Sequence, residues 1–160
     1  MHRFHFLPGT QSSRVENEEY FPIRVVFDPA MGTNRFAGFY FGARNLLEFT
    51  IDQTSGRVKE FQIVTCDRYH IFEEECTIPS ATNFGGISFT GPQHNDCDTF
   101  FVEVYSNCFR ILLSFASPAV QYAVGQVLFG LDEGGELVSL TITNITPDDI
   151  THTISELQSD

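Results

Sequence analysis

The sequence has few basic residues and no tryptophan. Lysine and arginine together number 9 against 21 aspartates and glutamates, so the formal net charge is -12. Phosphate binding depends on clustered cations, so this balance argues against a surface for nucleic acid or for an anionic membrane. Acidity of this kind either serves solubility alone or speeds the encounter with a basic protein partner.

Long uninterrupted apolar runs are also missing. The most apolar segment, residues 110–131, is interrupted by Ser114, Ser117, Pro118 and Gln121, so it does not predict a membrane-spanning helix. The opening residues "MHRFHFLPGT" lack the apolar core of a secretory signal. We therefore expect a cytoplasmic protein whose cysteines stay reduced, with no membrane partner.

Catalytic signatures are absent as well. The sequence contains neither the GxSxG motif of a nucleophile elbow nor a GxxxxGK[ST] phosphate-binding loop. The glycine pair in "NFGGISFTG", Gly85 and Gly86, precedes a strand-like stretch, so it predicts a turn and not a phosphate cradle. We expect no catalytic residues, no cofactor and no enzymatic activity.

Four side chains have the chemistry of zinc ligands. They are Cys66, His70, His94 and Cys97, in the stretches "CDRYH" and "HNDC". Structural zinc sites usually present a CxxC pair, and neither stretch contains one. We therefore expect buried thiols and surface histidines here, and no bound metal.

Two segments predict β-hairpins of the same design. In residues 45–64, apolar and polar side chains alternate, and Asp52 and Gly56 provide the turn chemistry between the two strands. Residues 127–142 repeat this plan around "DEGGE", where Asp132 opens the turn. Such likeness is common among hairpins, so it does not establish an internal repeat.

The remaining pattern predicts a single domain over residues 1–160, of a mostly β (α+β) class. We expect an antiparallel sheet of hairpins, either curved or arranged as a sandwich, with one short C-terminal helix. Thr146 is the expected N-cap of that helix, and Ile150, Ile154 and Leu157 recur at helical spacing on its apolar face. Residues 8–20 are expected to form a polar, mobile loop, and residues 78–98 an irregular stretch with a short strand at 87–89.

Acidic residues gather where loops and hairpin turns are expected, and binding residues often occupy such positions on a rigid sheet. If two of these clusters share a face, they present a negative patch to a positive partner. The candidate partner-binding residues are Glu73, Glu74, Glu75, Asp96, Asp98, Asp132, Glu133 and Glu136.

The segments "NLLEFTIDQTSGRVKEFQIVTCDRYH" and "GQVLFGLDEGGELVSLTIT" resemble hairpins of the immunity proteins that bacteria carry beside polymorphic toxins, especially in contact-dependent growth inhibition systems. The resemblance implies a stoichiometric inhibitor of a cognate toxin domain, often a basic nuclease. It carries over no functional residue. The alternatives are a small β-rich enzyme or ligand-binding domain with a pocket among its phenylalanines, and an adaptor subunit without catalysis.

Overall fold

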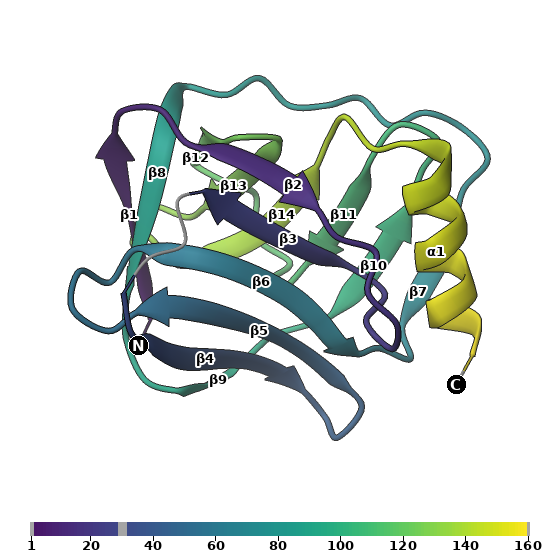
Figure 1. The fold of residues 1–160 in the computed structure, drawn as a ribbon, viewed down its shortest axis with the longest axis horizontal. Helices are drawn as coiled ribbons and strands as arrows, with labels where there is room; N and C mark the ends of the chain where they lie inside the picture. Colours follow the sequence, from purple (N-terminus) through teal and green to yellow (C-terminus); the bar gives the residue numbers. More distant parts are fainter. Residues whose placement is uncertain (1, 29–31, 160) are drawn as a thin grey trace.

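The fold is a sandwich of two β-sheets with one helix beside it (Figure 1). The computed structural model describes residues 2–28 and 32–159. Within these residues it contains fourteen strands and a single C-terminal helix, which confirms the mostly β (α+β) class predicted from the sequence.

The first sheet has eight strands and the second has six. In spatial order, the first contains β1 (Arg3–Pro8), β8 (Asn83–Thr90), β12 (Val120–Val124), β13 (Val127–Leu131), β14 (Leu137–Ile142), β11 (Phe109–Leu112), β10 (Phe101–Val104) and β7 (Tyr69–Ile71). The second contains β2 (Ser12–Val15), β3 (Arg24–Asp28), β6 (Val58–Thr65), β5 (Asn45–Asp52), β4 (Asn34–Phe41) and β9 (His94–Asp96).

The expectation of an antiparallel sheet of hairpins holds for most neighbouring strand pairs but not for all. Three neighbouring pairs are parallel: β7 with β10, β8 with β12, and β4 with β9. In each pair one strand arrives through a long connection and not a tight turn, as parallel pairing requires. Alternation in a sequence predicts strands, but it does not report which edge a strand joins.

Phenylalanine rings fill the space between the two sheets. Phe129 of the eight-stranded sheet lies with its ring centroid 6.1 Å from that of Phe27 and 6.4 Å from that of Phe61, both in the six-stranded sheet. Phe4 contributes another contact across the sandwich, 5.3 Å from Phe49 between centroids. Most of these rings meet at inclined angles, which suits the quadrupoles of aromatic side chains.

Both predicted hairpins form, and an aspartate closes each turn. Asp52 accepts hydrogen bonds from the backbone and hydroxyl of Ser55, and Gly56 follows with a φ of 76°. In the second hairpin, Asp132 Oδ1 accepts from the backbone N–H groups of Gly134 and Glu136, both at 2.9 Å. The first hairpin belongs to the six-stranded sheet and the second to the eight-stranded sheet.

The segment expected to be a mobile loop, residues 8–20, is partly a strand. β2 pairs with β3 at the edge of the six-stranded sheet, and Pro8 is the last residue of β1. Beyond β2, Asn17 donates a hydrogen bond to Asp149 of the helix. The polar composition reflects an edge strand, which has one row of unpaired backbone groups facing water.

The glycine pair expected to form a turn lies inside strand β8 instead. Gly85 pairs with Pro8 and Gly86 with Leu7, so β8 spans eight residues and not the three predicted at 87–89. A Cβ atom on Gly85 would lie 2.2 Å from the carbonyl oxygen of Leu7. Gly85 is needed because β1 approaches closely, whereas a Cβ atom on Gly86 would meet the side chains of Arg57 and Gln11. The chain does not reverse at either residue.

Helix α1 (Pro147–Gln158) begins at the predicted N-cap. Thr146 accepts from the N–H of Asp149, and the Asp149 carboxylate accepts from the N–H of Thr146, which forms a capping box. Leu157 is buried against the core, and the hydroxyl of Thr153 donates to the carbonyl of Pro22 at 2.7 Å. No helix in the described ranges has the length and apolar content to cross a membrane.

Candidate functional site

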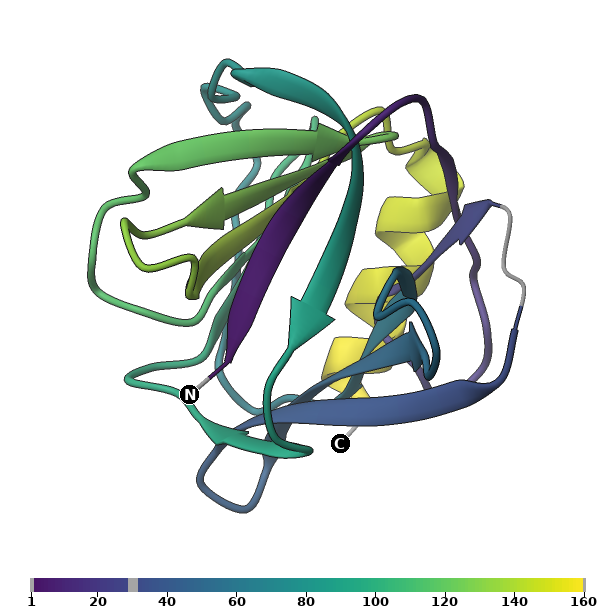
Figure 2. The same ribbon diagram turned by 90° about the vertical axis from the view of Figure 1, so that its left-hand side faces the viewer.

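A cavity of about 260 Å³ opens at one end of the sandwich, where elements of both sheets meet. The six-stranded sheet contributes β9 and Phe39 of β4. The eight-stranded sheet contributes the turn between β13 and β14, together with Leu113 and Ser114 after β11. His2, which immediately precedes β1, completes the wall, and both ribbon views place the start of β1 beside β9 (Figures 1 and 2).

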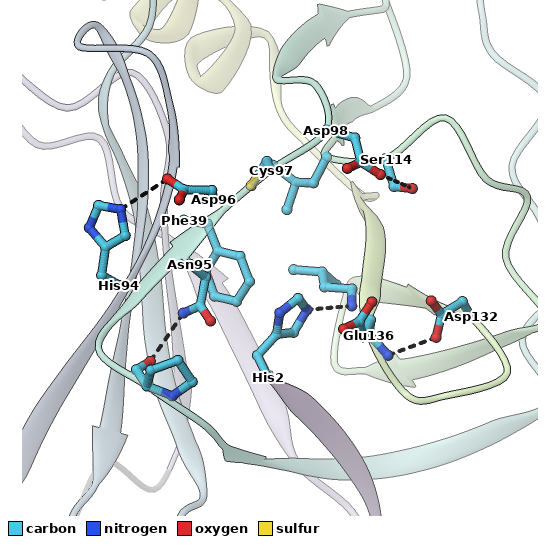
Figure 3. Close-up of a pocket in the computed structure, with 13 residues that line it drawn as sticks. His2, Phe39, His94, Asn95, Asp96, Cys97, Asp98, Ser114, Asp132 and Glu136 are labelled. Carbon is cyan, nitrogen blue, oxygen red and sulfur yellow. Dashed lines mark hydrogen bonds and ion pairs between the residues drawn. The ribbon is translucent and has the colours of Figure 1, made fainter.

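Four predicted partner-binding residues line this cavity, namely Asp96, Asp98, Asp132 and Glu136. They come from two clusters that lie more than thirty residues apart in the sequence. Figure 3 shows Asp98 at one side of the cavity and Asp132 with Glu136 at another. Among the described residues, no lysine or arginine lines this cavity. Its electrostatic character is therefore negative.

His2 lies in the middle of the cavity wall (Figure 3) and is neutral. Its Nε2 accepts a hydrogen bond from the N–H of Leu137 at 2.9 Å, so the proton of the neutral ring is on Nδ1. Burial lowers the pKa of His2 to about 4, although the charge of Asp132 acts in the opposite direction. The ring packs edge-on against Phe39, with 4.7 Å between centroids.

An aromatic and polar rim borders the cavity on the β9 side. His94 Nε2 lies 2.9 Å from Asp96 Oδ1, and its ring stacks on Tyr40 with centroids 4.2 Å apart. The neighbouring Asn95 is buried and donates to the carbonyl oxygens of Gly38 and Pro92. These two bonds hold the short strand β9 in place, so the positions of His94 and Asp96 are fixed by the sheet.

Cys97 lines the cavity but is poorly suited to act as a nucleophile. Burial, together with the charges of Asp98 and Asp96, raises the pKa of this thiol to about 12. A cysteine reacts as its thiolate, which these surroundings disfavour. Asp98 itself accepts a hydrogen bond from the hydroxyl of Ser114 at 3.4 Å.

The four residues considered as zinc ligands are distributed over different elements. Cys66 is buried just after β6, His70 is exposed in β7, His94 is in β9, and Cys97 follows β9. Across residues 2–28 and 32–159, no three histidine, cysteine, aspartate or glutamate side chains are grouped closely enough to hold a metal ion.

The third predicted acidic cluster, Glu73 to Glu75, lies at the opposite end of the eight-stranded sheet. Strands β7, β10 and β14 run in the same direction, because β10 is parallel to β7 and both β10 and β14 are antiparallel to β11. The cavity residues come before β10 and β14, whereas the glutamates come after β7. The three glutamates are exposed in the loop that leads to β8.

Glu133 has an intermediate position. It lies at the exposed tip of the hairpin between Asp132 and Glu136, but it faces a different depression, beside β1 and β12. The structure therefore places four of the predicted residues in one cavity, one beside it and three far from it.

Two residues near this site were not predicted from the sequence. His2 lies in the opening stretch, where the pattern gives no sign of its distant partner, Leu137. Phe115, next in sequence to Ser114, is 83% exposed. Phe115 follows an apolar strand and precedes Ala116, Ser117 and Pro118, which mark the start of a loop. This position is the one signal in the sequence that predicts an exposed ring.

The sequence matches no model of a known protein family, and it has no significant match among curated proteins.

Proposed function

We propose that this protein is an immunity protein, which binds and neutralises a basic toxin domain through the acidic cavity at the end of the sandwich. The observation that supports this proposal is that Asp98, Asp132 and Glu136, from segments distant in the sequence, line one cavity, with Asp96 on its exposed rim (Figure 3). The net charge of -12 adds a long-range attraction for a positive partner.

The dimensions of the cavity suit a side chain and not a whole domain. A volume of about 260 Å³ accepts one lysine or arginine side chain of a partner, and the surrounding carboxylates can accept its hydrogen bonds. The rest of the interface would then form on the rim around the cavity. His94, Tyr40 and Asp96 supply one part of this rim.

Phe115 supplies an apolar anchor close to the same opening. Its ring is almost fully exposed, and its neighbour Ser114 lines the cavity. Protein interfaces commonly combine a buried aromatic anchor with a polar rim, and such aromatic residues carry much of the binding energy. An exposed phenylalanine beside an acidic cavity fits this arrangement.

A nuclease is the class of toxin that best complements these features. Nucleases must be cationic where they hold phosphate, so clustered carboxylates can occupy the same positions as the phosphates of a substrate. Steering between opposite charges would also speed association, which matters for an inhibitor that must act before its toxin does. The proposed mechanism is steric and electrostatic, and it involves no chemical step.

The proposal is tested by co-expressing this protein with the protein encoded immediately upstream of its gene. We expect the neighbour alone to arrest growth, and co-expression to restore growth and to give a stable complex. If the neighbour is harmless, or if no complex forms at micromolar concentration, the proposal is wrong. The alternative of a β-rich enzyme or ligand-binding domain would then be preferred.

A matched pair of charge reversals tests the surface itself. Asp96→Lys with Asp98→Lys changes the cavity end, and Glu73→Lys with Glu75→Lys makes the same change in net charge at the opposite end. We expect the first pair to slow association with the partner by about tenfold or more and the second pair to have a much smaller effect. Equal effects would assign the attraction to net charge alone.

A further inference from the structure

At the end of the eight-stranded sheet far from the cavity, the segment after β7 runs along the turn that connects β10 to β11. The N–H of Ser106 donates to the carbonyl of Glu74 at 3.1 Å. The Asn107 side chain then forms two hydrogen bonds with Cys76, accepting from its N–H and donating to its carbonyl, both at 2.9 Å. Cys76 is therefore held firmly against this turn.

The residue after Asn107 is a second cysteine. Because Asn107 is bonded to the backbone of Cys76, Cys108 lies beside Cys76, close enough for a charge on Cys76 to act on it, and both cysteines are free thiols. Their exposure differs, because Cys108 is fully buried whereas Cys76 is half-buried. An oxidant arriving from solvent therefore meets Cys76 first.

Arg110 brings a positive charge to the exposed member of the pair. Its Nη2 donates a hydrogen bond to the sulfur of Cys76. The guanidinium is held by Glu103, 3.6 Å away across the two paired strands β10 and β11, and it lies over the ring of Tyr105. A guanidinium in this position stabilises the negative charge on sulfur that thiol oxidation requires.

We propose that Cys76 and Cys108 form a peroxide-sensitive thiol pair, in which Cys76 is oxidised first and Cys108 resolves the product into a disulfide. This pair is distinct from the cavity and does not depend on the proposed inhibitor function. Its oxidant is hydrogen peroxide or another hydroperoxide.

The chemistry takes two balanced steps. In the first, the deprotonated sulfur of Cys76 attacks one peroxide oxygen, an S–O bond forms as the O–O bond breaks, and the departing hydroxide takes up a proton to leave as water. In the second, the sulfur of Cys108 attacks the sulfenic acid of Cys76, an S–S bond forms, and the S–O bond breaks. The hydroxide leaves with the thiol proton of Cys108 as a second water. Two thiols are oxidised and one peroxide is reduced.

The surroundings of Cys108 favour Cys76 as the thiol that reacts first. Burial raises the pKa of its thiol to about 12, with the neighbouring Cys76 as the next cause. Cys108 therefore stays protonated at neutral pH, and its attack on the sulfenic acid of Cys76 requires its thiol proton to pass to the departing hydroxide. The resulting disulfide would tie the loop that carries Glu73 to Glu75 to the start of β11 and would constrain the unfolded chain.

The test treats the full-length protein with hydrogen peroxide and then digests it with chymotrypsin without reduction. Chymotrypsin cuts after Phe72, Phe84, Tyr105 and Phe109, so the two cysteines lie on separate peptides. We expect a cross-linked pair of these peptides that disappears on reduction. If peroxide leaves both thiols free, or links either to Cys66 or Cys97 instead, the proposal is overturned.

Three variants separate the roles of the residues. With Cys108→Ser, dimedone should trap the sulfenic acid of Cys76, whereas Cys76→Ser should abolish both the adduct and the cross-link. Arg110→Gln should slow cross-linking by about tenfold, and an unchanged rate would remove Arg110 from the mechanism. The control is Cys97→Ser, which replaces a half-buried cysteine at the cavity end and should not alter the yield of cross-linked peptides. If Cys108→Ser does not fold, dimedone added to the wild-type protein at early times traps the same intermediate.

Discussion

The two ends of the eight-stranded sheet both carry carboxylates and a cysteine, but they differ in what surrounds these groups. At the cavity end, carboxylates from two segments distant in the sequence line one cavity where the two sheets meet. At the far end, Glu73 to Glu75 form one exposed run in a loop, beside a thiol pair and Arg110. Charge alone therefore does not define a site, and the convergence of distant segments does.

The cysteines at the two ends of the sheet also differ in their surroundings. Cys97 at the cavity end lies between two aspartates that oppose a thiolate, whereas Cys76 at the far end accepts a hydrogen bond from a guanidinium. The charges next to Cys97 disfavour a thiolate, whereas Cys76 has a cation at its sulfur, although both side chains are half-buried. The neighbours of a cysteine decide its chemistry more than its exposure does.

The largest effect on stability is expected from a substitution in the core that supports both ends of the sheet. Phe129 is fully buried and lies within 6.4 Å, between ring centroids, of Phe4, Phe27, Phe49 and Phe61. Phe129→Ala should lower the free energy of unfolding by about 4 kcal/mol, because it removes the transfer energy of the ring and leaves a cavity. Urea denaturation measures this loss. A loss confined to one end, seen as a two-step transition, would contradict a shared core.

Local patterns were enough to predict both hairpins and the helix cap. Asp52 and Asp132 form the turns expected of them, and Thr146 caps α1 as predicted. These features depend on residues that are close in sequence, so their physics is visible in a short window. The strand content and the class of fold followed from the same kind of signal.

Long-range pairing could not be predicted in this way. Gly85 and Gly86 look like a turn because the strand with which they pair, β1, is far away in the sequence. The three parallel pairings have the same cause. The acidic clusters were visible as residues, but their arrangement into one cavity and one separate loop depends on strand direction. His2 was missed because its partner is Leu137.

The second prediction concerns the pH dependence of stability, which we attribute to His2 at the cavity end. Unfolded histidine titrates near pH 6.5, whereas His2 in the folded protein stays neutral down to about pH 4. Between these values the unfolded state binds more protons, so stability falls as the pH falls through this window and is fully present above it. The contribution is on the order of 2 kcal/mol after allowance for solvent screening.

Denaturation at a series of pH values checks this expectation, with His2→Gln as the comparison. Glutamine can accept the hydrogen bond from Leu137 but does not titrate, so the variant should lose less stability between pH 6.5 and pH 4. Parallel curves for the two proteins would show that His2 is not the group responsible.

The third prediction separates the two roles of Asp132, which closes a turn and also lines the cavity. Asp132→Ala should cost about 1 kcal/mol of stability, because the N–H groups of Gly134 and Glu136 lose their acceptor. Asp132→Asn keeps an acceptor oxygen and removes the charge, so it should retain most of the stability while weakening attraction for a basic partner. Equal destabilisation by both substitutions would mean that the charge, and not the turn, is the stabilising element.

The smallest effect is expected at the far end. Glu74 contributes its backbone carbonyl to the fold by accepting from the N–H of Ser106, and its carboxylate is exposed. Glu74→Ala keeps that carbonyl, so the urea midpoint should stay unchanged and the rate of disulfide formation between Cys76 and Cys108 should not fall. A substitution at the cavity end that removes one carboxylate, Asp98→Ala, should leave stability similarly intact but reduce association with the basic partner. If Glu74→Ala weakened that association as much as Asp98→Ala, the distinction between the two ends of the sheet would fail, and partner binding would have to be assigned to a wider acidic surface.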